Sequence, residues 1–171
     1  MPAIVLQQVS SAFAQENAGK TLEKPFALKW LLRYVESEEE RSSLAEACAT
    51  EHIHAWGAKA ERRHQFAKMP TSETLVLFRR HKFVYGYGVI VAKLESEKAG
   101  EKLWGSDNDG QTWSLIFLLR EFKRLKTPAL ASRMNVHLNR EPSDNWQGLT
   151  AVVVTSDARL RAFFAEQTGD A

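Results

Sequence analysis

The stretch TLVLFRRHKFVYGYGVIVAKLES, residues 74–96, decides the fold class of this 171-residue chain. TLVLF (74–78) and VYGYGVIVAKL (84–94) are short apolar runs rich in β-branched and aromatic residues. They predict two strands, with the charged RRHK at the turn between them. Gly86 and Gly88 alternate with aromatic residues in the second run. Glycines inside a strand indicate a bulge or a close approach of another backbone.

Strands and helices alternate on both sides of this hairpin. Further strands are expected at FALKWLLRYV (26–35), IHAW (53–56), TWSLIFLLREFKRL (112–125) and TAVVVT (150–155). The third of these could also be a helix, but Pro128 follows it and aromatic residues crowd its start, which favours a strand. Helices are expected over residues 3–18, about 38–49 after a capping box formed by Ser37 and Glu40, 61–69, and 156–167 with Ser156 or Asp157 as cap.

Residues 95–111 are expected to form a polar loop, and residues 127–148 an irregular segment. Five or six strands with helices at intervals predict an α+β fold, a curved mixed sheet or small β-barrel flanked by helices. No repeat or linker interrupts the sequence, so residues 1–171 are expected to form a single domain, with residues 1–22 as an N-terminal helix or tail.

The composition is that of an ordinary globular domain, with 44% hydrophobic and 26% charged residues. Cys48 is the single cysteine, which excludes an internal disulfide and suggests a reducing, cytoplasmic setting. The first residues lack the pattern of a secretory signal, and no apolar run is long enough for a membrane helix. We therefore expect a cytoplasmic protein that does not contact a membrane.

The sequence shows none of the motifs of common catalytic centres. It contains no phosphate-binding glycine loop and no GxSxG motif. Cys48, His52 and His54 suggest a metal site, but no fourth ligand has a suitable spacing, and Cys48 fits a small buried residue better. We therefore expect neither a metal nor a cofactor, and no enzymatic activity.

Positive charge is concentrated in three segments, although the net charge is only +2. Residues 52–68 carry four Lys or Arg against one acid, residues 120–140 carry six against one, and RRHK adds three more. If these segments share a face, they form an anion-binding surface; the alternative is that they are solvated loops and helix faces.

Two of the five tryptophans, Trp56 and Trp104, are each followed by glycine and lie at the end of an element or in a polar loop. Either they cover an edge of the core, or they offer a flat face to a flat ligand such as a base. Trp113 begins an apolar run and is expected in the core, whereas Trp30 could face either way.

The order of these features resembles the EVE and YTH families, which are relatives of the PUA fold. Within them the chain is most similar to the EVE-like N-terminal DNA-binding domains of McrB-type, modification-dependent restriction systems. The resemblance covers residues 26–135. It is carried by HAWG (54–57), the F-x-K-M at 66–69, the hairpin, LWG (103–105), and TWSLIFLL after Gly110.

The resemblance implies a DNA reader that holds a flipped, modified base between aromatic rings, as the specificity part of a restriction system. The motor or nuclease would lie elsewhere, on a longer polypeptide or on a partner. The residues implied at the base are Trp56 and Trp104 as walls, together with Trp30, Gly57 and Tyr85. The residues implied at the phosphates are Lys29, Lys59, Arg62, Arg63, Arg79, Arg80 and Lys82.

Two other interpretations stay open at this point. Relatives of this fold bind RNA, so the chain could instead recognise modified RNA. Alternatively, all five tryptophans could be structural in an unrelated α+β protein. The sequence does not decide between 6-methyladenine and 5-methyl- or 5-hydroxymethylcytosine, because all three are flat and the added groups are small.

Overall fold

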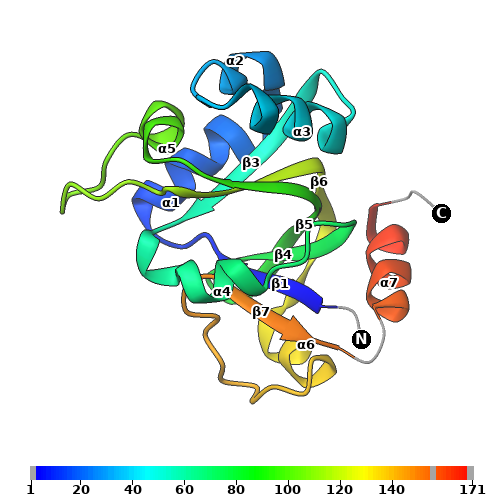
Figure 1. Cartoon of the computed structure of the whole chain (residues 1–171). Coiled ribbons are helices and arrows are strands. Elements are labelled where there is room, and N and C mark those ends of the chain that lie inside the picture. Colours follow the sequence, from blue (N-terminus) through cyan, green and yellow to red (C-terminus); the bar gives the residue numbers. More distant parts are fainter. Residues whose placement is uncertain (1–2, 155–156, 169–171) are drawn as a thin grey trace.

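The computed structural model describes residues 3–154 and 157–168, which form one mixed sheet with helices around it (Figure 1). The seven strands are β1 (Ala3–Gln8), β2 (Phe26–Ala27), β3 (His52–Ala58), β4 (Thr74–Arg80), β5 (Phe83–Glu95), β6 (Leu115–Leu130) and β7 (Thr150–Val153). Their order in the sheet is β2-β3-β6-β5-β4-β1-β7. Neighbouring strands are antiparallel except β1 and β4, which run parallel.

The sheet is open, because β2 and β7 are its two edges. The expected mixed sheet is therefore confirmed, and the small closed barrel is wrong. Bulges interrupt the pairing of β5 with β6, and one lies beside Gly86. A Cβ on Gly86 would come within 2.6 Å of the Phe122 ring, and one on Gly88 within 2.7 Å of the Glu121 carbonyl oxygen. The close approach predicted from these two glycines is confirmed.

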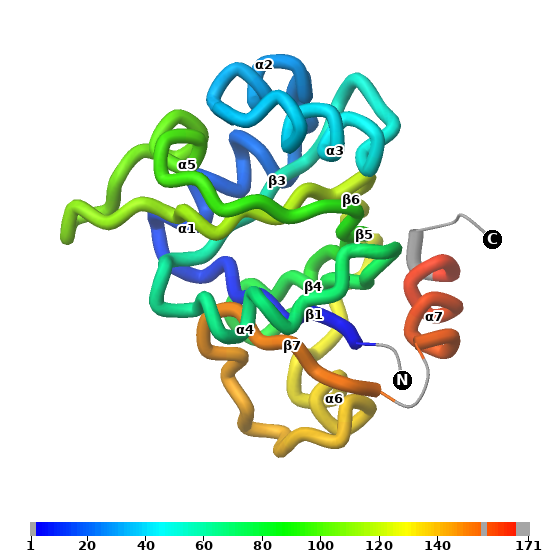
Figure 2. The backbone as a smooth tube through the Cα atoms, viewed as in Figure 1, coloured from blue at the N-terminus to red at the C-terminus, as the bar shows by residue number. Residues whose placement is uncertain are grey.

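Short helices surround the sheet. They are α1 (Ala12–Asn17) with the π-helical turn η1 (Ala18–Leu22), α2 (Leu28–Leu32), α3 (Glu38–Cys48), the 3₁₀ turn η2 (Ala60–Arg62) with α4 (Arg63–Lys68), α5 (Glu97–Trp104), α6 (Ala131–His137) and α7 (Ala158–Thr168). The tube in Figure 2 shows α2 and α3 at one end of the sheet and α6 at the other. Ser37 caps α3 as predicted, since its hydroxyl accepts from the backbone N–H of Glu40 at 3.2 Å.

The core consists of two clusters, and β1 contributes to both. Val5 and Val9 belong to the larger cluster, whereas Ile4 and Leu6 belong to the smaller one. Because β1 is buried on both faces, it is a continuous apolar run without the alternation of a half-exposed strand. The prediction of a helix over residues 3–18 is therefore wrong for its first half and right only for α1.

Three further predictions are corrected by the structure. FALKWLLRYV forms only the two-residue strand β2 and then α2, where Leu28 and Leu31 turn into the core. The segment 95–111 contains the helix α5, which begins after Ser96, whose hydroxyl accepts from the N–H of Ala99. The segment 127–148 contains the end of β6 and the helix α6.

Other predicted elements are confirmed. IHAW lies in β3, residues 61–69 are largely helical in η2 and α4, and β7 covers the first part of TAVVVT. The closing helix α7 is present, and Asp157 pairs with Arg161 at its start, at 2.6 Å. The alternative cap, Ser156, lies outside the described residues.

Candidate nucleic-acid interface

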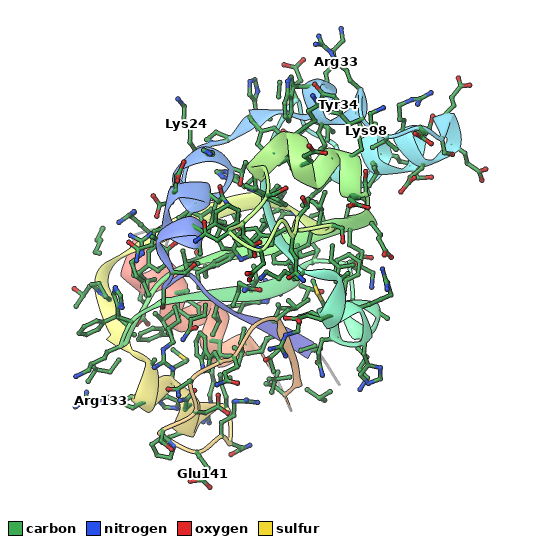
Figure 3. All side chains as sticks on the ribbon, turned by 90° about the vertical axis from the view of Figure 1, so that its left-hand side faces the viewer. Lys24, Arg33, Tyr34, Lys98, Arg133 and Glu141 are labelled. Carbon is green, nitrogen blue, oxygen red and sulfur yellow. The ribbon has the colours of Figure 1, made fainter. Side chains whose placement is uncertain are left out.

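A hollow of about 500 Å³ lies where β1 and β3 end. The start of α1 and the turn between α5 and β6 complete its wall, and this turn projects from the left side of Figure 1. The same side of the molecule faces the viewer in Figure 3. The residues that line the hollow include Gln7, Ser10, Ser11, Phe13, Gly57, Lys59, Glu61, Arg62, Asp107, Asp109, Trp113 and Gly148.

Two aromatic rings line this hollow. Phe13 stands edge-on to Trp113, with ring centroids 5.3 Å apart and an angle of 84° between the planes. Phe13 is partly exposed, and Trp113 is 8% exposed. The α1 cap fixes Phe13, because the Ser11 hydroxyl accepts from the N–H of Ala14 at 3.1 Å. Phe13 therefore supplies most of the exposed ring surface in the hollow, and Trp113 contributes only the small part of its ring that burial leaves accessible.

The two tryptophans expected as walls lie behind Trp113. Trp56 is fully buried, with its ring centroid 4.9 Å from that of Trp113. Trp104 is 3% exposed and lies 5.3 Å from Trp113. Its Nε1 donates to the Thr21 hydroxyl at 2.9 Å. In this structure neither ring presents a stacking face, so the open cage of Trp56 and Trp104 is not formed. Both tryptophans cover the core, which is the first of the two alternatives left open by the sequence.

Gly57 explains why a glycine follows Trp56. A Cβ at this position would lie 2.5 Å from the Trp104 ring, so glycine allows Trp104 to pack against β3. Gly57 also lines the hollow. It is the one residue of the five expected at the base that does so.

Trp30 and Tyr85 lie elsewhere. Trp30 is on α2, with its ring 6.2 Å from that of Phe26 and 5.2 Å from that of Tyr34. Tyr34 is at the upper end of the molecule in Figure 3. Tyr85 is 6% exposed, and burial raises the pKa of its hydroxyl. Neither residue lines the hollow.

Of the seven cations expected at phosphates, Lys59 and Arg62 line the hollow. Lys59 Nζ lies 2.6 Å from Asp107 Oδ2. This hydrogen bond raises the pKa of Lys59 and lowers the pKa of Asp107. Arg62 forms no ion pair with a residue in the described part of the chain. Its guanidinium lies against Gly148, where a Cβ would come within 2.4 Å of Nε. Arg62 is thus the available cation at the rim.

The other five cations lie apart from the hollow. Arg63 pairs with Glu95 through Nε at 2.9 Å. Lys29, on α2, and Lys82, at the β4–β5 turn, are exposed. Arg79 and Arg80 are used in contacts within the protein: Arg79 donates to the Asp144 carbonyl at 2.7 Å, and Arg80 lies 3.1 Å from Glu23.

Lys93 on β5 contacts the C-terminal end of the basic helix α4. Its Nζ donates to the carbonyls of Phe66 at 2.7 Å and Met69 at 2.9 Å, at the end of α4. Burial lowers the pKa of Lys93. This lysine satisfies carbonyls that the helix leaves free and so fixes the end of the segment that begins at Arg62.

The N-terminal segment brings four residues to the hollow that were not expected there, Gln7, Ser10, Ser11 and Phe13. The first 22 residues were expected to form a helix or tail. The available signal was Ser10-Ser11 after an apolar run, which is the pattern of a helix cap after a strand.

Other candidate sites are less informative. A second hollow of about 790 Å³, mostly apolar, lies between β6, α6 and α7. Cys48 is buried as predicted, and burial raises its pKa to about 11. Among residues 3–154 and 157–168, no three His, Cys, Asp or Glu side chains are grouped to hold a metal. No helix in the same ranges has both the length and the apolar character that crossing a membrane requires.

No protein-family model matches the chain, and no curated protein matches it in sequence. A solved structure, the N-terminal domain of McrB from Thermococcus gammatolerans bound to m5C DNA, matches it in three dimensions with a TM-score of 0.64. The match covers 98% of each chain at 14% sequence identity. The chain therefore has the same fold as that McrB N-terminal domain.

Proposed function

We propose that the chain binds duplex DNA containing a modified base and takes that base, turned out of the duplex, into the hollow between β1, β3 and the 105–112 turn. The observation that carries the proposal is the pairing of Phe13 and Trp113 with Arg62 in one hollow. The protein with the same fold bound to m5C DNA supports the choice of ligand.

The energies involved are compatible with base flipping. Turning a base out of a duplex costs a few kcal/mol. Stacking on an aromatic ring returns about 1–3 kcal/mol per base. Burial of a methyl group adds about 0.8 kcal/mol, which gives a modest preference for a methylated base. The hollow, at about 500 Å³, lies within the range of small-molecule pockets.

Trp56 and Trp104 have a different role in this proposal from the one implied by resemblance. Both pack behind Trp113, at 4.9 Å and 5.3 Å between ring centroids. They therefore hold Trp113 in place, and the base contacts Trp113 and Phe13. Replacement of either supporting tryptophan would therefore weaken DNA binding indirectly, because it would disturb the packing around Trp113.

Phosphate binding depends mainly on Arg62. Around the hollow, Lys59 and Arg62 face three carboxylates, those of Glu61, Asp107 and Asp109. Because Lys59 is already paired with Asp107, its charge reaches a phosphate only when this pair separates. We therefore expect binding with a weak salt dependence, equivalent to few released counterions.

We further propose that the chain is the specificity part of a modification-dependent restriction system, and that motor and nuclease activities lie on other domains or partners. The isolated chain should neither cleave nucleic acid nor hydrolyse nucleotides, with or without magnesium. Activity that co-purifies with the chain and disappears on replacement of one acidic residue would overturn this part of the proposal.

A binding panel tests the proposed function. Otherwise identical duplexes each contain one base: unmodified, 6-methyladenine, 5-methylcytosine or 5-hydroxymethylcytosine; matched RNAs are included. We expect tighter binding to at least one modified duplex, and Phe13→Ala should reduce that preference by about fivefold or more, which corresponds to the loss of one stacking contact. Phe26→Ala, at the edge strand β2, is the matched control and should keep the preference.

Each result has a defined meaning. Equal affinity for all duplexes would overturn the proposed function. Tighter binding to a modified RNA than to any duplex would favour the RNA alternative. A preference that survives Phe13→Ala in a folded protein would place the base elsewhere.

A further inference from the structure

Gln7, at the end of β1, is a buried polar residue beside the hollow. It is 6% exposed and lines the hollow. Its Oε1 accepts no hydrogen bond from the described residues. Buried acceptors in folded proteins are almost always paired, so an unpaired one calls for an explanation, such as a ligand contact.

The strand geometry places the Gln7 amide on the aromatic side of the sheet. Side chains alternate along a strand, so Gln7 shares a face with Val5 and Val9. Both valines belong to the core cluster that contains Trp113. Gln7 also lies opposite Phe78 in the parallel pairing of β1 with β4. The Gln7 side chain thus lies on the face of β1 that packs into the cluster containing Trp113, and Gln7 lines the same hollow as Phe13 and Trp113.

The hydrogen bond to the neighbouring carbonyl fixes which amide atom is free. Nε2 of Gln7 donates to the carbonyl oxygen of Gln8 at 3.5 Å. Exchange of the two amide atoms would set Oε1 against that carbonyl, acceptor against acceptor. The free atom is therefore an acceptor, and it can pair only with a donor on the ligand.

We propose, resting on the function proposed above, that Gln7 Oε1 accepts a hydrogen bond from the exocyclic amino group of the flipped base. The hollow then selects methylated bases that carry an amino group and discriminates against thymine. Oε1 is shielded from solvent in this structure, so the side chain must shift toward the hollow when a base enters, with Nε2 kept on the Gln8 carbonyl so that Oε1 faces the base.

An acceptor in the hollow is needed to distinguish 5-methylcytosine from thymine. Thymine and 5-methylcytosine have the same ring and the same methyl group, so stacking and methyl burial cannot separate them. They differ at position 4, which is an oxygen acceptor in thymine and an amino donor in 5-methylcytosine, and at N3, which carries a hydrogen only in thymine. An acceptor placed at position 4 therefore distinguishes the two bases. Because thymine is present throughout DNA, a reader without an acceptor would be occupied by thymine. Facing thymine, Oε1 would meet an acceptor, and that mismatch provides the discrimination.

The test compares these two bases in one duplex. Each is placed opposite an abasic site, so that neither loses a base pair on leaving the helix. A second pair, 6-methyladenine and N6,N6-dimethyladenine, covers a preference for adenine, because the dimethylated base has no N–H to donate. The measured quantity is the ratio of the two Kd values within each pair, for wild type, Gln7→Leu, Gln7→Glu and the control Ser43→Leu.

We expect wild type to prefer the base with the N–H by about tenfold, the value of one hydrogen bond of ordinary strength. Gln7→Leu should bring the ratio close to one, with an unchanged or higher Tm, since leucine fills a similar volume without an unpaired acceptor. Gln7→Glu keeps an acceptor and should keep the preference, with weaker binding to every duplex because of its charge. Ser43→Leu, at an exposed position on α3 that does not line the hollow, should behave as wild type.

Several outcomes would overturn the inference. One is a folded Gln7→Leu protein that keeps the full preference. Another is a wild type that prefers methylated DNA but binds thymine as well as 5-methylcytosine, in which case the proposed function stands and the role of Gln7 fails. If Gln7→Leu does not fold, Gln7→Glu decides, because loss of the preference there would contradict an acceptor role. If the wild-type protein shows no preference for any modified base, the proposed function itself is wrong.

Discussion

Two basic stretches of this protein, residues 59–63 and residues 79–82, differ in whether their arginine side chains face solvent or contact groups inside the protein. In the first stretch Arg62 reaches the rim of the hollow without an ion pair to a described residue, and Arg63 is exposed beside Glu95. The stretch forms η2 and the first residue of α4, and none of its residues is buried. Its charge therefore faces solvent and a prospective ligand.

The second stretch turns its arginines inward. Arg79 donates to the carbonyls of His81 and Asp144, both at 2.7 Å, and its guanidinium lies 5.7 Å from the centroid of the Trp146 ring. Arg80 lies 4.6 Å from the centroid of Tyr85 and pairs with Glu23. Burial lowers the pKa of Arg79.

A cationic side chain is therefore available to a ligand only where the protein leaves it without an internal partner. Arginine can lie over an aromatic ring and hydrogen-bond to groups inside the protein. Arg79 and Arg80 do this on β4, where they lie over Trp146 and Tyr85 and contact the Asp144 carbonyl and Glu23. Arg62 lies on the short turn η2 without an ion pair to a described residue, and in the function proposed above it binds a phosphate.

The largest effect is expected at the aromatic residue that precedes the first stretch. Trp56→Ala should lower the free energy of unfolding by about 3–5 kcal/mol, because it removes a fully buried ring that supports Trp113. Trp56→Phe should cost less, since Nε1 of Trp56 has no partner among the described residues. Chemical denaturation measures both. A Trp56→Ala protein with wild-type stability would show that the ring is free to stack on a base.

Arg79→Ala should affect stability and leave DNA binding nearly unchanged. We expect a loss of about 1 kcal/mol in the free energy of unfolding, because the hydrogen bonds from Arg79 to the His81 and Asp144 carbonyls are lost. The exposed neighbour Lys82 is the control, and Lys82→Ala should stay within about 0.5 kcal/mol of wild type. A selective loss of DNA affinity in Arg79→Ala, without destabilisation, would remove the contrast between the two stretches.

Arg62→Ala should do the opposite. It should weaken binding to modified and unmodified duplexes equally, by about 1 kcal/mol, and reduce the salt slope by about one. Arg63→Ala should have a smaller effect, because Arg63 is already paired with Glu95. Titrations at several salt concentrations measure both. A loss of preference for the modified base at unchanged total affinity would mean that Arg62 contacts the base.

The smallest effect is expected for Asp107→Asn. The change removes a negative charge at the hollow and frees Lys59, so binding to all duplexes should tighten by a few tenths of a kcal/mol at low salt. The new asparagine keeps an oxygen that can accept from the N–H groups of Asp109 and Gln111, which Asp107 now does at 2.9 Å. Lys59→Met in the same background should cancel the gain. Tightening that persists after Lys59→Met would mean that the lysine is not the group released.

Elements with local signals could be predicted correctly from the sequence. The hairpin of β4 and β5 follows from two apolar runs around a charged turn, and α3 from a capping box. The close approach at Gly86 and Gly88 follows from glycine inside a strand, and the burial of Trp113 from the apolar run that it begins. Each of these depends on residues a few positions apart, so the pattern contains the physical cause.

The remaining features depend on contacts between segments that are far apart in the sequence. β1 is a strand because β4 and β7 pair with both its edges, although those strands lie far along the chain. Whether Trp56 faces solvent or Trp113 depends on the pairing of β3 with β6, and whether Arg79 is free depends on Asp144. The hollow brings Gln7, Phe13, Arg62 and Trp113 together from four separate segments. Local patterns cannot specify such a site, because side-chain direction and burial are set by long-range packing.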